Sequence, residues 1–174
     1  MASFPSSYIK TEASSVTRSA DLCSITGSNF AEWYRQGVGT VVCEFNSDFN
    51  NFGRLVNFES GGGQVDESMI FTVSGTPDIR FQIYKGTTRH SNLLQSVSAT
   101  TNKAAISFME NDYILETDGD RKTSSSGEVP VVDRLLVGHG GSGSPSTLLN
   151  GHIRKLQYWT QRLSNTQLQA LTRG

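Results

Sequence analysis

Cysteine, excess charge of one sign and long apolar runs are all scarce in this sequence, and each scarcity excludes a class of protein. The two cysteines, Cys23 and Cys43, are too few for a disulfide framework. We interpret both as buried small hydrophobic residues, with a cross-strand disulfide as the alternative. The 15 basic and 16 acidic residues give a formal charge of -1 and form no long block of one sign, which argues against nucleic-acid binding.

Segments that would direct the chain to a membrane are also missing. No apolar stretch reaches about 18 residues, so no membrane insertion is expected. The N-terminal residues lack the charged start and apolar segment of a signal peptide. With 174 residues, the chain fits one domain that can bury a core without metals or disulfides.

What the sequence does contain is a series of short runs rich in Val, Ile, Phe, Tyr and Thr, separated by clusters of Gly, Asn, Asp and Ser. In the clearest run, Ile79, Phe81 and Ile83 share one face of a strand and polar side chains share the other. The expected strands are 15–25, 39–45, 54–59, 68–73, 79–84, 103–109, 113–116, 133–137 and 151–159. The sequence therefore predicts an all-β fold, a two-sheet antiparallel jelly-roll β-sandwich of about nine strands.

Turns and loops are expected between these runs. The Asn111-Asp112 and Asp118-Gly119 pairs flank one strand and are typical of the turns of a meander. The glycines in segments 61–63 and 138–143 predict exposed loops, and segment 123–127 is also predicted to be an exposed loop.

The C-terminal region carries two further signals. In 151–159, Ile153 and Trp159 alternate onto one face while Leu156 and Tyr158 fall on the other, so a β-bulge or burial of both faces is expected, with both aromatic rings in packing roles. After it, a serine and a glutamine three residues apart, at 164 and 167, fit a capping box, which predicts one short C-terminal helix.

Catalysis is not expected from the acidic residues. Glu110, Asp112 and Glu116 are the sharpest enzyme hypothesis, because retaining glycosidases need two carboxyl groups about 5 to 5.5 Å apart. However, a turn at Asn111-Asp112 would place Glu110 and Glu116 on different strands, and the spacing differs from that of the sandwich glucanases. We therefore predict no catalytic residues and interpret the trio as a solvated hairpin.

Metal binding has equally little support. His90, His139 and His152 are scattered without the spacing of a zinc site. Asp118 and Asp120 offer oxygens of the kind that calcium takes, but acidic residues in a hairpin turn explain them more simply. No cofactor or metal is predicted, with calcium as the alternative.

Sugar binding needs an exposed aromatic ring beside a few polar groups, because a pyranose has one apolar face and a rim of hydroxyls. Trp33 and Tyr34 lie in an irregular segment and form one candidate platform. Tyr84 lies on the polar face of its strand, followed by an expected loop with Arg89 and His90, and forms the other. The alternative is that Trp33 caps the core and Tyr84 is an ordinary sheet-face aromatic residue.

Two groups of motifs resemble a known family. At the front are PSSYIKT at 5–11 and VTRSAD at 16–21. At the back are LNGHIR at 149–154, the YW pair at 158–159, and RLS at 162–164 before the helical segment. Together they are similar to the concanavalin A-like lectin/glucanase superfamily, in the laminin G-like variety found in phage tail, tail-fibre and virion surface proteins.

This resemblance implies a curved jelly roll at 15–174, preceded by an N-terminal extension or linker at 1–14, whose loops or concave face bind glycans. It implies a phage tail or virion protein made in the host cytoplasm and present in several copies, with a homotrimer as the hypothesis. The expected partner is a host cell-surface carbohydrate. The alternatives are a purely structural virion module whose partner is another virion protein and, less favoured, a glycoside hydrolase.

Overall fold

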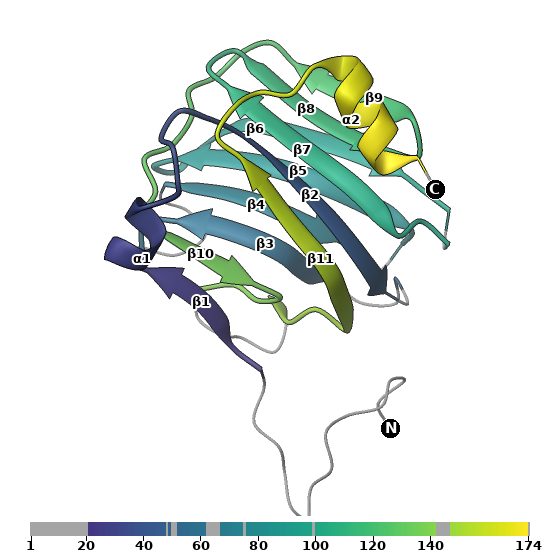
Figure 1. Ribbon diagram of the computed structural model, residues 1–174, viewed down its shortest axis with the longest axis horizontal. Helices are drawn as coiled ribbons and strands as arrows, with labels where there is room; N and C mark the ends of the chain where they lie inside the picture. The colour runs from purple at the N-terminus through teal and green to yellow at the C-terminus, as the bar shows by residue number, and fades with distance from the viewer. Residues whose placement is uncertain are drawn as a thin grey trace, which may run out of the picture.

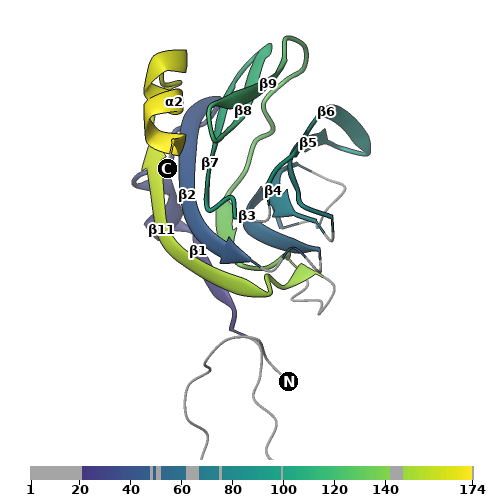
Figure 2. The same cartoon turned by 90° about the vertical axis from the view of Figure 1, so that its right-hand side faces the viewer.

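Two antiparallel sheets stack face to face around a shared hydrophobic core (Figure 1). The computed structural model describes residues 21–47, 49, 52–61, 67–74, 76–98, 100–141 and 147–173. Figure 2 shows the two layers from the side. The predicted jelly-roll β-sandwich is confirmed. The domain boundary predicted near residue 15 lies outside the described residues.

The six-stranded sheet contains strands from both ends of the chain. Its strands, in spatial order, are β1 (Cys23–Thr26), β10 (Arg134–Val137), β3 (Gly53–Glu59), β4 (Ser68–Val73), β5 (Asp78–Lys85) and β6 (Thr88–Ser96). The five-stranded sheet has the order β11 (Gly151–Trp159), β2 (Val38–Ser47), β7 (Lys103–Met109), β8 (Asp112–Thr117) and β9 (Asp120–Ser124). The edge strands β6 and β9 therefore close the same side of the sandwich, where they contact each other.

The core lies between the sheets because alternate side chains of each strand point inward. In β4 and β5 the inward residues are Met69, Phe71, Val73, Ile79, Phe81 and Ile83, all fully buried. Facing them from the other sheet are Val41, Cys43, Ile106, Phe108, Tyr113 and Leu115. Their intervening neighbours point to the outer faces, which is the feature that positions the candidate site.

Helix α2 (Asn165–Thr172) covers the outer face of the five-stranded sheet, as Figure 2 shows. Its N-cap is Ser164, and the predicted capping box with Gln167 is confirmed in both directions. Leu168 is fully buried against Val42 and Ile114 of the sheet. A second helix, α1 (Ser28–Ala31), is a single turn that the sequence pattern did not indicate.

Several local predictions are confirmed. The register of β11 against β2 shifts between Ile153 and Lys155, which is the expected bulge. The turn from β7 to β8 has Asn111 at a φ of 57°, and the turn from β8 to β9 has Asp118 at 48° and Gly119 at 87°. Left-handed φ values of this kind suit Asn, Asp and Gly, which explains why these turns could be recognised.

Other predictions are wrong. Strands β6 and β9 were not expected, and Thr123 and Ser124 belong to β9 instead of to a loop. The first strand begins at Cys23 within the described residues, and Cys23 is exposed, with no disulfide to Cys43. The errors share a cause: edge strands expose one side, so their sequences are polar and lack the apolar alternation of central strands.

The glycine-rich loop after β10 was expected to be exposed, but His139 and Gly140 are buried. Residues 142 and 143 of the same predicted loop lie outside the described part of the chain, as do 62 and 63 of the other. Within the described ranges, no helix has the length and apolar character needed to cross a membrane.

Candidate functional site

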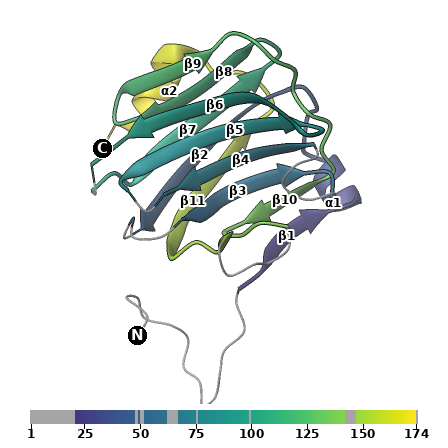
Figure 3. The same ribbon diagram turned by 180° about the vertical axis from the view of Figure 1, so that it is seen from behind.

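The outer face of the six-stranded sheet, seen in Figure 3, carries three rows of side chains across four neighbouring strands. Strand register defines the rows because paired residues lie side by side on the same face. From β3 to β6 the rows are Arg54, Thr72, Arg80 and Leu94; then Asn57, Ile70, Gln82 and Asn92; then Glu59, Ser68, Tyr84 and Arg89. We call these twelve residues the outer grid. Nine of them are polar or charged, which is unusual for positions as buried as those on β3 and β4.

The β3 side of the outer grid is covered by the loop that follows β10. A Cβ atom on Gly141 would lie 2.4 Å from Oε1 of Glu59, and one on Gly140 would lie 2.8 Å from Cζ of Arg54. The loop therefore lies against these two side chains at a distance that only glycine permits. His139 fixes the loop, since one ring nitrogen is 2.8 Å from the Gly140 carbonyl and the other is 3.0 Å from the Cys23 carbonyl.

Buried charge is concentrated beneath that loop. Arg54 is 2% exposed and Glu59 is 3% exposed. Oε2 of Glu59 accepts a hydrogen bond from Nδ2 of Asn57 at 2.6 Å. Burial lowers the pKa of Arg54, opposed by the nearby Glu59 carboxylate and Tyr84. The guanidinium nevertheless keeps its charge in a protein, so this part of the sheet holds a desolvated cation beside the Glu59 carboxylate.

Several polar atoms of the first two rows are unsatisfied. Nε of Arg54, Oγ1 of Thr72, Nε of Arg80 and Oδ1 of Asn57 are buried, and they have no hydrogen-bond partner among the described residues. Arg54 and Arg80 both align with Thr72, one from each side. Each buried polar group left unpaired costs about 1 to 3 kcal/mol. A cluster of such groups on one face indicates a place where something else supplies the missing partners.

The β5 and β6 side of the outer grid is accessible. Arg80 and Tyr84 are partly buried, Asn92 and Arg89 are exposed, and Leu94 is 39% exposed. The Tyr84 hydroxyl lies 3.5 Å from Nε2 of Gln82, which points to the same face. An aromatic ring, two guanidinium groups and an amide thus surround one solvent-facing area.

The structure unites part of the platform predicted around Tyr84. Tyr84 and Arg89 are register partners on β5 and β6, so they lie side by side in a hairpin instead of in a strand and a loop. His90 has no register partner on β5, because the pairing of β5 and β6 shifts at this point. Its Cβ lies 3.0 Å from the place where a Cβ on Gly127 would stand. His90 is therefore next to the segment after β9 and not among the three rows.

The other predicted platform lies in the core. Tyr34 is 8% exposed, its ring stacks on Phe30 with centroids 4.5 Å apart, and it also stacks on Tyr158. Trp33 contacts Tyr158 edge to face at 5.1 Å. Burial raises the pKa of the Tyr34 hydroxyl well above its usual range. The alternative, in which Trp33 caps the core, describes this cluster, and Tyr34 has no free ring face for a sugar.

Two of the three clustered acidic residues, Asp112 and Glu116, are held in ion pairs near α2. Asp112 Oδ2 accepts from Nε of Arg162 at 2.9 Å, and Glu116 Oε2 accepts from Nε of Arg121 at 2.5 Å. Glu110 lies in the turn between β7 and β8. Among the described residues, no three His, Cys, Asp or Glu side chains gather in a group able to hold a metal ion.

Sequence reasoning missed the β3 and β4 half of the outer grid. Arg54, Asn57, Glu59 and Thr72 are spread over two strands that read as ordinary sandwich strands. No local signal was available, because the burial of Arg54, Asn57 and Glu59 in β3 is a property of the folded sheet. Only the sheet register shows that they share a face.

Comparison with known proteins establishes the class of fold. No family model matches the sequence, and no curated protein matches it either. Among solved structures, the CBM40 domain of the Ruminococcus gnavus IT-sialidase, bound to α2,3-sialyllactose, has a TM-score of 0.68 and 18% identity, covering 78% of this chain and 83% of that one.

Two further structures extend the comparison. The K499G mutant of the NanB sialidase from Streptococcus pneumoniae has a TM-score of 0.69 and 14% identity, covering 86% of this chain and 26% of that one. A SAP-like pentraxin from Limulus polyphemus has a TM-score of 0.59 and 12% identity, covering 78% and 70%. At these identities the likeness shows a shared lectin-like jelly-roll fold.

Proposed function

We propose that this chain is a non-catalytic carbohydrate-binding domain that holds an acidic sugar on the outer grid. The observation that carries the proposal is the row of Arg54, Thr72 and Arg80, in which the two arginine Nε atoms and the threonine hydroxyl are buried without hydrogen-bond partners among the described residues. A sugar carboxylate that approaches at the partly exposed Arg80 would supply acceptors to this row.

The chemistry of the outer grid matches such a ligand. Guanidinium groups bind carboxylates through strong, charge-assisted hydrogen bonds. Arg54 and Arg80 outnumber the single carboxylate of the grid, that of Glu59, so an anion is favoured over a cation. Tyr84 offers a partly exposed ring for the apolar face of a pyranose, and Asn92 and Arg89 can contact its hydroxyls.

The structural comparisons support this choice of ligand. CBM40 domains of this fold are described as bound to α2,3- and α2,6-sialyllactose, and sialic acid carries a carboxylate. Two similar structures, the leech intramolecular trans-sialidase and the K499G mutant of the NanB sialidase, are longer chains, of which the matched region covers 23% and 26%. The paired acids of a glycosidase are absent from the described residues of the outer grid, where Glu59 is the one carboxylate.

Location on a phage tail or virion, in several copies, remains part of the proposal because it rests on the sequence resemblance. Several copies would make weak sites sufficient, since linked sites gain avidity of about 10² to 10⁴-fold. The second candidate is a structural virion module without a glycan. The accessible Tyr84 and Arg89 pair favours binding over that alternative. Light scattering that gives a trimer would support the assembly, and a strict monomer of the full chain would count against it.

Calorimetric titration with 3'-sialyllactose tests the binding function, after subtraction of the heat that lactose, which lacks the acidic unit, gives in the same titration. We expect binding of the acidic sugar alone at the outer grid. Arg80→Gln should weaken it at least about tenfold, because a charge-assisted hydrogen bond contributes about 1.5 to 3 kcal/mol. Tyr84→Ala should weaken it as well.

The matched control is Arg154→Gln, which removes an exposed arginine from β11 of the other sheet and should leave binding unchanged. A glycan array that includes hexuronic acids identifies the sugar if 3'-sialyllactose does not bind. Absence of binding beyond that of lactose for every acidic glycan, or such additional binding that survives both Arg80→Gln and Tyr84→Ala, would overturn the proposal.

A further inference from the structure

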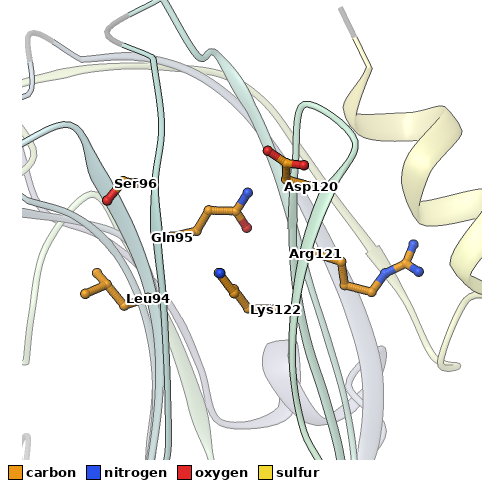
Figure 4. Close-up of a pocket in the computed structure, with 6 residues that line it drawn as sticks. All are labelled: Leu94, Gln95, Ser96, Asp120, Arg121 and Lys122. Carbon is orange, nitrogen blue, oxygen red and sulfur yellow. The ribbon is translucent and has the colours of Figure 1, made fainter.

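A cavity of about 390 Å³ opens at the side of the sandwich where the edge strands β6 and β9 meet. Its walls are Leu94, Gln95 and Ser96 from one sheet and Asp120, Arg121 and Lys122 from the other. Figure 4 shows these six side chains. The cavity lies between the sheets and is distinct from the outer grid, which it borders through Leu94 alone.

Polar residues occupy positions of this cavity that point into the sandwich. Gln95 is paired with Ile79, and Lys122 is paired with Leu115, both of which are core residues. Because side chains alternate along a strand, Gln95 and Lys122 lie on the inward faces of β6 and β9. An apolar side chain at either position would extend the core. In Figure 4 they point toward each other from the two sheets, whereas Arg121 points away toward α2.

Neither of these two side chains is hydrogen-bonded to another described residue. Gln95 is 4% exposed, and its Oε1 is buried without a hydrogen-bond partner among the described residues. Lys122, in contrast, is exposed to solvent, and it forms no ion pair or hydrogen bond within the described part of the chain. Their neighbours are occupied, since Ser96 donates to Asp78 at 2.7 Å and Arg121 is bonded to Glu116.

We propose that this cavity is a second binding site, for a neutral saccharide unit. A sugar hydroxyl can accept a hydrogen bond from Nζ of Lys122 and donate one to Oε1 of Gln95, which no charged group can do as well. An anion would face the Gln95 oxygen and the Asp120 carboxylate, and a cation would face Lys122. The volume is in the range of small-ligand pockets, which begin at about 300 Å³.

The placement of Leu94 links this cavity to the outer grid. Leu94 is the register partner of Arg80 and also lines the cavity, and its side chain is 39% exposed. An oligosaccharide with its acidic sugar on the outer grid can extend across Leu94 to a neutral unit between Gln95 and Lys122. That extension rests on the proposed function, whereas binding of a neutral sugar in the cavity does not.

Titration of the isotopically labelled chain with lactose and with maltose, followed by NMR, tests the cavity directly. We expect saturable shifts of the Gln95 side-chain amide and of the backbone amides of 94–96 and 120–122. Gln95→Leu and Lys122→Met should each weaken this binding at least tenfold. Lys155→Met, on the exposed edge strand β11 of the same sheet as Lys122, is the matched control and should have no effect.

The NMR titration and the two variants can contradict the proposed cavity site in separate ways. Absence of shifts at the cavity with either sugar, or shifts unchanged in both variants, would overturn the inference. Gln95→Leu is expected to stay folded, because leucine suits an inward position, and its unfolding curve verifies this. If both variants instead promote self-association without any effect on sugar shifts, the two residues protect a sheet edge and the site does not exist. Binding of 3'-sialyllactose at the outer grid would be unaffected by that result, so the two proposals fail separately.

Discussion

Arg54 and Arg80 extend from β3 and β5 onto the same face of the six-stranded sheet, and each aligns with Thr72 of the strand between them. The two guanidinium groups and the threonine hydroxyl each keep a buried atom without a hydrogen-bond partner among the described residues. Such an arrangement costs stability in the ligand-free protein. It is what a preorganised binding site requires, since the donors are already in place when the ligand arrives.

Thr72→Val tests whether that cost is real. Valine has the shape of threonine without the hydroxyl, so removing an unpartnered buried oxygen should leave the free energy of unfolding unchanged or raise it by about 1 kcal/mol. Affinity for the acidic sugar should fall at the same time. Urea unfolding and calorimetric titration measure the two effects.

Thr40→Val is the matched control for this change. Thr40 is also fully buried, but its Oγ1 is 3.0 Å from Oγ of Ser107 and bonds the backbone of Gln161 and Leu163. Its loss should therefore destabilise the protein by about 1 to 3 kcal/mol. Equal destabilisation by both variants would contradict the interpretation of Thr72.

Gly141→Ala tests the role of the loop after β10. The added Cβ would lie 2.4 Å from Oε1 of Glu59, so either the loop or the Glu59 carboxylate must shift. We expect weaker binding of the acidic sugar and a loss of about 1 to 3 kcal/mol in stability, the usual cost of overpacking. Gly141→Ser should have a larger effect. Unchanged binding in both variants would show that the loop does not shape the site.

For Glu116→Gln we predict a change in the free energy of unfolding that depends on pH. Burial raises the pKa of Glu116 above its ordinary value, against the opposing effect of Arg121. The contribution of this carboxyl group to stability is therefore fully present below its pKa in the unfolded chain, about 4.3. It is lost as the pH rises through the pKa that the group has in the folded protein. Glutamine mimics the protonated form, so the variant should gain relative to the unchanged protein between about pH 4 and neutrality. Urea unfolding across this pH interval measures the difference in free energy of unfolding between the two proteins. A difference that does not change with pH would contradict the prediction.

The two cysteines should differ in reactivity. Cys43 is fully buried, and burial raises the pKa of its thiol to about 12, so little reactive thiolate forms. Cys23 is exposed. We expect one thiol to react with a colorimetric thiol reagent in the native protein and two after unfolding. Cys23→Ser should abolish the native reaction, whereas rapid reaction of two native thiols would mean that Cys43 is accessible.

Local patterns made much of the fold predictable. Strand β4 occupies the predicted residues, because alternation of Met69, Phe71 and Val73 with their neighbours follows directly from the pleat. The capping box at Ser164 and the turn at Asp118-Gly119 were also recognisable, since each depends on residues close together in the sequence. Strands β6 and β9 were not recognisable from the sequence. Their residues are mostly polar, and they form strands because each pairs with a neighbouring strand.

The candidate site was predictable only in part. Tyr84 and Arg89 could be selected because an aromatic ring on a polar strand face is visible in the sequence. Tyr34 could not be told from an exposed aromatic residue, since its burial depends on stacking with Tyr158, more than a hundred residues away. Nothing local distinguishes Arg54 from a surface arginine.

The sequence by itself determined the class of fold, the turns and the terminal helix, because each depends on backbone preferences and on apolar periodicity within a few residues. The tertiary structure alone decided which polar residues meet. Arg54, Thr72 and Arg80 are separated in the chain and become neighbours only through strand register, and Gln95 faces Lys122 only because two edge strands meet. Register is set by the packing of the whole sandwich, and that information is not held in any one segment.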